Sequence, residues 1–193
     1  MRRRHLPQVI ERAAEREDWP VARIAAMLRE CDRDAVAEAL AQALAARLKR
    51  ASQAESEIVR LLQLAKVANS ALLRPAVCRL LERPAPAQVV AAALAALWHP
   101  EDAEHARRAL GHPEWFVRVA AVRALDRIGG PEDRERLVAL LSDSSWWVRY
   151  RTAQTLARLP GITRQALEKM LSESSDRFAA DMLAQVLSER DAR

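Results

Sequence analysis

Apolar side chains recur along most of the chain at intervals of three and four residues, the spacing of one face of an α-helix. Alternating runs of Val, Ile and Thr, which would indicate β-strands, do not occur. Ala and Leu, the strongest helix formers, supply much of the apolar half of the sequence. In the first half of the chain this pattern predicts helices over Leu6–Glu17, Pro20–Cys31, Arg33–Lys49, Ser56–Val67, Ala71–Arg83 and Ala87–Trp98. Pro75 falls within one of these segments and is expected either to kink that helix or to begin it.

A repeat of 31 residues organises the second half of the chain. Residues 100–130 align without a gap with residues 131–161, and about a third of the positions are identical, which is typical of a solenoid. A third unit, residues 162–192, keeps the leucines but lacks the Val-Arg pair, as a terminal repeat would. Each unit contains two helices, separated in the second unit by the N-cap candidates Asp143, Ser144 and Ser145.

These patterns predict an all-α fold, an α/α superhelix (solenoid) of about six antiparallel helix pairs. The expected organisation is irregular N-terminal helices over residues 1–55, degenerate helical repeats over residues 56–99, and three regular repeats over residues 100–192. All of them are expected to form one continuous solenoid domain.

The segments DSSWWVRYRTAQTLARLPG and HPEWFVRVAAVRALDRIGG share a turn, a Val-Arg pair, small residues and a leucine. This pattern resembles the second helix of HEAT repeats, especially the short bacterial form with units of about thirty residues, over roughly half of the chain. The resemblance implies a scaffold or adaptor that is not an enzyme and works in the cytoplasm. Some bacterial members of the family are cytoplasmic parts of membrane-anchored proteins, and Arg2–Arg4 would suit a position just inside a membrane.

The neighbouring tryptophans Trp146 and Trp147 are expected to point in different directions. At 100° per residue, the apolar stripe of their helix is centred between Val148 and Leu156. Trp146 lies at the edge of this stripe and Trp147 lies on the polar side. We therefore expect Trp146, and Trp115 one repeat earlier, to pack between repeats in a structural role.

The polar side of the second helices carries an aromatic row, because Phe116, Trp147 and Phe178 are spaced by 31 residues. The polar residues that share this side are Arg123, Arg127, Arg151, Gln154 and Arg158. Aromatic residues beside arginines are typical of protein interfaces, so this face is predicted to bind a protein partner or a neighbouring domain. The alternative is local packing, in which each ring folds back over the preceding loop.

Two further arginines, Arg118 and Arg149, lie on the inward side of their helices. An inward-facing arginine needs an acidic partner, for which Asp143 is the first candidate and Asp126 the second. In HEAT-like proteins the matching arginine usually braces the repeats, so the resemblance implies the same structural role here.

No motif indicates catalysis, a cofactor, a metal or a small-molecule substrate. His99 and His112 flank a helix about 16 Å long, too far apart to share one ion. Both precede Pro-Glu, whereas HEAT-like hydroxylases bind iron through His-Glu dipeptides. Carboxylates near helix starts, such as Asp102 and Glu104, are interpreted as charges that complement the helix dipole. Cys31 and Cys78 are expected to be buried free thiols.

The net charge of +5 permits a nucleic-acid partner without requiring one. Binding to the DNA backbone through the arginines is therefore the alternative function. A HEAT-like DNA glycosylase is less favoured, because Asp181 is the nearest candidate for its catalytic carboxylate. Acids near the starts of the first helices are expected to give a mixed surface, and they are Glu101, Asp102, Glu132 and Asp133.

Overall fold

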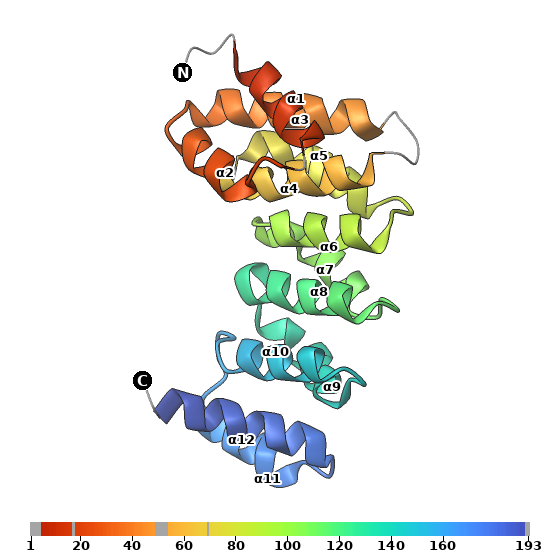
Figure 1. The fold of residues 1–193 in the computed structure, drawn as a ribbon. Helices are drawn as coiled ribbons and strands as arrows, with labels where there is room; N and C mark the ends of the chain where they lie inside the picture. The colour runs from red at the N-terminus through yellow and green to blue at the C-terminus, as the bar shows by residue number, and fades with distance from the viewer. Residues whose placement is uncertain (1–4, 17, 49–53, 69, 192–193) are drawn as a thin grey trace. The chain divides into compact units, whose positions relative to one another are not determined.

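The computed structural model describes residues 5–16, 18–48, 54–68 and 70–191 (Figure 1). Within these residues the chain forms twelve α-helices and four short 3₁₀ helices, without a strand, which confirms the all-α prediction. The basic cluster Arg2–Arg4 lies outside the described residues. None of the described helices is long and apolar enough to cross a membrane.

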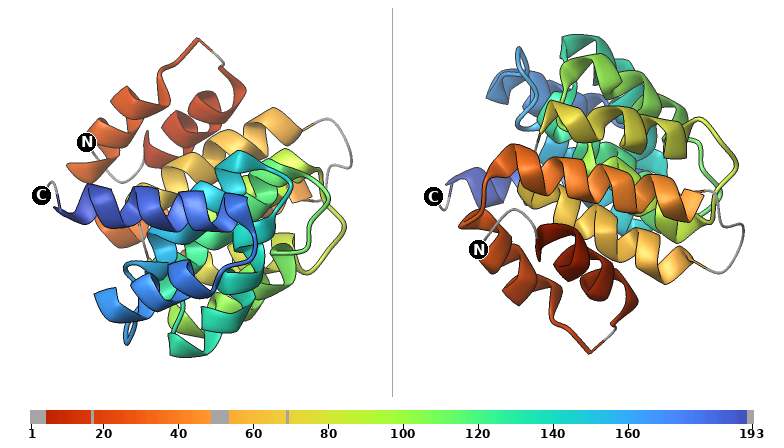
Figure 2. Two further views of the ribbon diagram at one scale, coloured as in Figure 1. Left: turned by 90° about the horizontal axis from the view of Figure 1, so that it is seen from below. Right: turned by 90° about the horizontal axis from the view of Figure 1, so that it is seen from above.

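The chain divides into two compact units, residues 1–97 and residues 98–193. In the first unit, α3 pairs with α4 and α5 pairs with α6, while α4 and α6 pack against each other. Helix α1 lies along α3 and α4, and α2 packs on α4 (Figure 2). The helices are α1 (Leu6–Glu15), α2 (Val21–Arg29), α3 (Arg33–Leu48), α4 (Glu55–Ala68), α5 (Arg74–Leu81) and α6 (Ala87–Ala96).

Pro75 begins a helix rather than kinking one. A 3₁₀ turn, Ala71–Leu73, is capped by the Ser70 hydroxyl, and α5 then starts with Pro75 in its first turn. The missing N–H of proline costs nothing at this position. Of the two expectations for Pro75, a helix start is therefore confirmed.

The first unit also buries a charge that the sequence reading missed. Arg47 on α3 is buried and forms ion pairs with Glu11 of α1 at 2.6 Å and with Glu57 of α4 at 2.8 Å. Its position three residues after Leu44, on the buried side of α3, is the signal that could have predicted this. Cys31 and Cys78 are only half-buried, so the expectation of buried thiols is wrong.

The second unit consists of three helical hairpins, α7/α8, α9/α10 and α11/α12. The second helices α8, α10 and α12 follow one another in Figure 1, and each packs on the next. Each hairpin falls within one of the three expected units, residues 100–130, 131–161 and 162–192. The helices are α7 (Ala103–Ala109), α8 (Trp115–Ile128), α9 (Arg134–Ala139), α10 (Trp146–Leu156), α11 (Arg164–Glu173) and α12 (Arg177–Asp191).

The apolar stripe of the second helices faces inward as expected. Val117 and Leu125 of α8, and Val148 and Leu156 of α10, are almost completely buried. Their spacing of 31 residues places equivalent side chains at equivalent depths in successive repeats. One continuous solenoid through both units remains a prediction.

Candidate functional site

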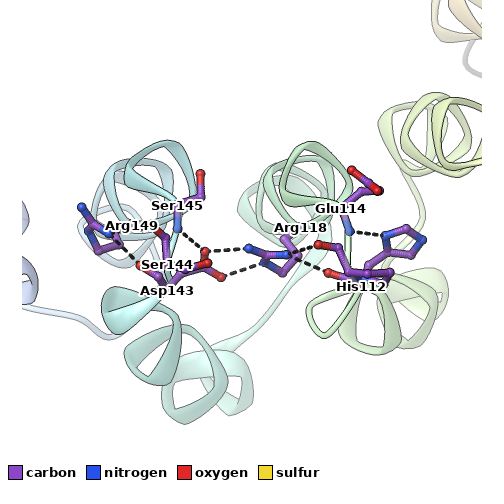
Figure 3. A network of polar contacts seen from close by, with 8 residues as sticks. His112, Glu114, Arg118, Asp143, Ser144, Ser145 and Arg149 are labelled. Atoms are coloured by element: carbon purple, nitrogen blue, oxygen red, sulfur yellow. Dashed lines mark hydrogen bonds and ion pairs between the residues drawn. The ribbon is translucent and has the colours of Figure 1, made fainter.

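A repeated arginine motif joins the hairpins of the second unit (Figure 3). Arg118 on α8 donates through Nε and Nη2 to the two carboxylate oxygens of Asp143, at 2.7 and 2.8 Å. Its Nη1 donates to the carbonyls of His112 and Pro113, both at 2.8 Å. Asp143 in turn accepts from the N–H of Ser145, the residue just before α10. The predicted brace between repeats is present.

Asp143 is held in its ionised form by these contacts. Burial alone would raise its pKa, but the hydrogen bonds from Arg118 and Ser145 outweigh burial and keep the pKa below its usual value. The carboxylate therefore stays charged at neutral pH and holds two repeats together.

Arg149, one repeat later, makes only half of the same motif. Its Nη1 donates to the carbonyls of Asp143 and Ser144, as Arg118 does in its own repeat. The position equivalent to Asp143 in the next repeat is Ser174, which offers no carboxylate to the guanidinium fork. The guanidinium instead lies 4.8 Å above the ring of Phe178, and its buried Nε has no hydrogen-bond partner among the described residues.

A second brace joins the first helices and corrects the expected surface charge. Arg107 on α7 donates to the two carboxylate oxygens of Asp133, at 2.6 and 3.2 Å. Asp133 also accepts from the N–H of Gly130. Asp133 and Asp102 are both buried, so the expectation that they contribute to a mixed surface is wrong. A buried carboxylate can satisfy the exposed N–H groups of a helix start while pairing with an arginine.

The expectation that Trp115 and Trp146 are packed between repeats is also wrong, since each is 44% exposed. Trp146 stacks on Tyr150, with ring centroids 5.0 Å apart. The buried positions of α10 are taken by smaller side chains, among them Thr152 and Ala153. Trp115 meets the ring of Phe116 edge-on.

Trp146 and Tyr150 form one wall of an open groove of about 640 Å³, whose other wall is α12. The Tyr150 hydroxyl donates to Glu189 at 2.9 Å, and this hydrogen bond raises the pKa of Tyr150. The sequence reading did not assign Tyr150. Its position four residues after Trp146, on the same helix face, is the signal that could have found it.

Asp181, the candidate glycosylase carboxylate, lies in the wall of this groove. Its side chain is exposed, and its Oδ2 lies 4.0 Å from Nε of Arg177, one helical turn earlier. A solvated carboxylate of this kind lacks the buried environment that tunes a catalytic acid or base.

The predicted aromatic row is exposed at two of its three positions. Trp147 is 57% exposed and Phe178 is 59% exposed. Phe116 is half-buried, because the ring of Trp115 packs against it. The prediction of an exposed row therefore holds for Trp147 and Phe178 and is wrong for Phe116.

The polar residues of this face come together at the contact between α8 and α10. Arg158, two residues after the end of α10, donates to both oxygens of Asp126 on α8, at 3.0 and 2.8 Å. Arg151 is half-buried near Arg123 and Arg158. The other two predicted members are Arg127, which is exposed and donates to the carbonyl of Arg123, and Gln154, which is half-buried.

The three histidines of residues 99–112 act locally. His99 accepts from the N–H of Glu101, and His112 accepts from the N–H of Glu114. Both His-Pro-Glu motifs are thus helix or turn caps. Nδ1 of His105 lies 2.7 Å from Nη2 of Arg108, one turn along the same helix. Across the described part of the chain, no group of three metal-ligating side chains converges.

The stacked hairpins and the arginine braces between them define a helical-repeat protein. A family model described as HEAT repeats matches residues 75–157 and, in an overlapping second match, residues 103–188. Together the matches cover residues 75–188, more than half of the chain. The chain therefore belongs to the HEAT-repeat family, whose members commonly mediate protein interactions and are generally not catalytic. No curated protein matches the chain.

Proposed function

We propose that this chain is a non-catalytic scaffold that binds a protein partner through the exposed side of α8, α10 and α12. The binding residues are those predicted from the sequence: Phe116, Trp147, Phe178, Arg123, Arg127, Arg151, Gln154 and Arg158. Family membership supports the general role, and the side chains of this face support its location.

The exposure of Trp147 is the observation that carries this proposal. A tryptophan that leaves 57% of its surface in water gains little for folding, whereas covering it in an interface would contribute substantially to binding. Arg151, one turn along the same helix, and Arg158 beyond it supply the guanidinium groups that are enriched in such interfaces.

A nucleic-acid partner is the alternative, and the structure contains one feature against it. Glu189 and Asp181 lie on α12 beside the groove, so the arginine-rich surface of α8 and α10 is followed by carboxylates. A nucleic-acid backbone that continued along the stack would meet these like charges.

The proposal is tested by affinity capture from the native cells, followed by titration of the purified captured protein. Trp147→Ala is expected to weaken binding by about thirtyfold or more, as a hot-spot residue does. The same change is expected to lower the free energy of unfolding by less than about 1 kcal/mol, because the ring is exposed.

The matched control is Val138→Ala, which removes an exposed apolar side chain from α9, a first helix. Binding should be unchanged in this variant. Equal affinities for wild type and Trp147→Ala, or capture of nucleic acid without protein, would contradict the proposal.

A further inference from the structure

The arginine-rich contact between α8 and α10 has too few carboxylates for its guanidinium groups. Asp126 is the acidic residue at this contact, and Arg158 occupies both of its oxygens. Arg123 and Arg151 lie close by, and among the described residues neither forms an ion pair. The cluster Arg123, Arg151 and Arg158 therefore carries an excess positive charge.

The positive charges around Arg151 repel one another. Burial lowers its pKa, and repulsion from Arg123 and Arg158 lowers it further, while Asp126 acts in the opposite direction. A guanidinium group stays protonated in spite of such shifts. The charged cluster is thus held together against repulsion, and an added anion would relieve that repulsion.

We infer that Arg123 and Arg151 bind a short acidic segment of the protein partner, with an apolar side chain of that segment resting on Trp147. This inference rests on the proposed function and specifies its partner chemistry. The planar fork of arginine matches a carboxylate with two parallel hydrogen bonds. Arg158 and Asp126 already display this geometry on the same face.

The arrangement favours a short segment over a long polyanion. Arg151 and Trp147 are one turn apart on α10, so a few extended residues would span both. Beyond α10, the groove toward α12 is lined by Asp181 and Glu189. These carboxylates would repel an anionic chain that extended further in that direction.

The test uses fluorescence anisotropy with the full chain and short fluorescein-labelled peptides of alternating glutamate and leucine. We expect the glutamate peptide to bind about tenfold more tightly than its glutamine counterpart. The double variant Arg123→Gln/Arg151→Gln should lose about tenfold in affinity. The control Arg134→Gln/Arg136→Gln removes two exposed arginines of α9 and should change affinity by less than about twofold.

Each other outcome overturns the inference. Equal binding of the glutamate and glutamine peptides would show that carboxylates are not recognised. Tighter binding of a single-stranded oligonucleotide of the same net charge would favour nucleic acid. If no peptide binds but a captured protein still depends on Trp147, the acidic-segment inference fails and the proposed scaffold function stands.

Discussion

Replacing Asp143 by alanine would break the contact that holds two repeats of the second unit together. The substitution removes both acceptors of the Arg118 fork and also the acceptor for the Ser145 N–H. The Arg118 and Asp143 side chains are only 12% and 7% exposed, so little water is available to replace the lost hydrogen bonds.

The expected loss in the free energy of unfolding is about 3 kcal/mol. Removing one partner of a buried ion pair costs about 3–5 kcal/mol. Partial access of water to Arg118 reduces this figure, and loss of the hydrogen bond from the Ser145 N–H adds about 1 kcal/mol. Asp143→Asn keeps an oxygen that can accept from the Ser145 N–H and should therefore be about 1 kcal/mol less damaging than Asp143→Ala.

The matched control is Asp126→Ala, which breaks a similar two-bond contact between α8 and the turn that follows α10. In that pair Arg158 is 51% exposed, so the expected cost is below about 1 kcal/mol. Urea unfolding followed by tryptophan fluorescence and circular dichroism gives both values. A cost for Asp143→Ala no larger than that for Asp126→Ala would refute the argument from burial.

Three further predictions concern stability and can be checked by the same urea unfolding experiment. Asp133 and Asp143 have lowered pKa values in the folded chain, so the stability that these carboxylates contribute is present at neutral pH. This contribution is lost as the pH falls below about 4. A urea midpoint of unfolding that stays constant down to about pH 3 would contradict this. Thr155→Val should raise the free energy of unfolding by about 1 kcal/mol, because the buried Thr155 hydroxyl has no hydrogen-bond partner within the described part of the chain. A loss of stability would show that the hydroxyl is satisfied. Ser174→Asp should add about 1 kcal/mol by placing a carboxylate opposite Arg149, and this gain should vanish in an Arg149→Met background.

Helical geometry accounts for what the sequence predicted well. A period of 31 residues and the 100° turn per residue were enough to locate the helices, direct Val148 inward and place Trp147 outward. They also paired Arg118 with Asp143, because an inward arginine needs an acid at a neighbouring helix start. These features depend on spacing within one helix or between equivalent positions of successive repeats, which the chain order records directly.

The exposure of side chains at the edge of a helix face was decided by tertiary structure alone. Helical phase placed Trp146 at the edge of the apolar stripe, but only the position of α12 leaves its ring beside an open groove. Asp133 sits among the charges of a helix start in sequence, yet Arg107 from the preceding repeat makes its burial favourable. The sequence by itself determined the repeat and the direction of each helix face; the tertiary structure decided which edge residues are covered, because coverage depends on how closely the next helix approaches.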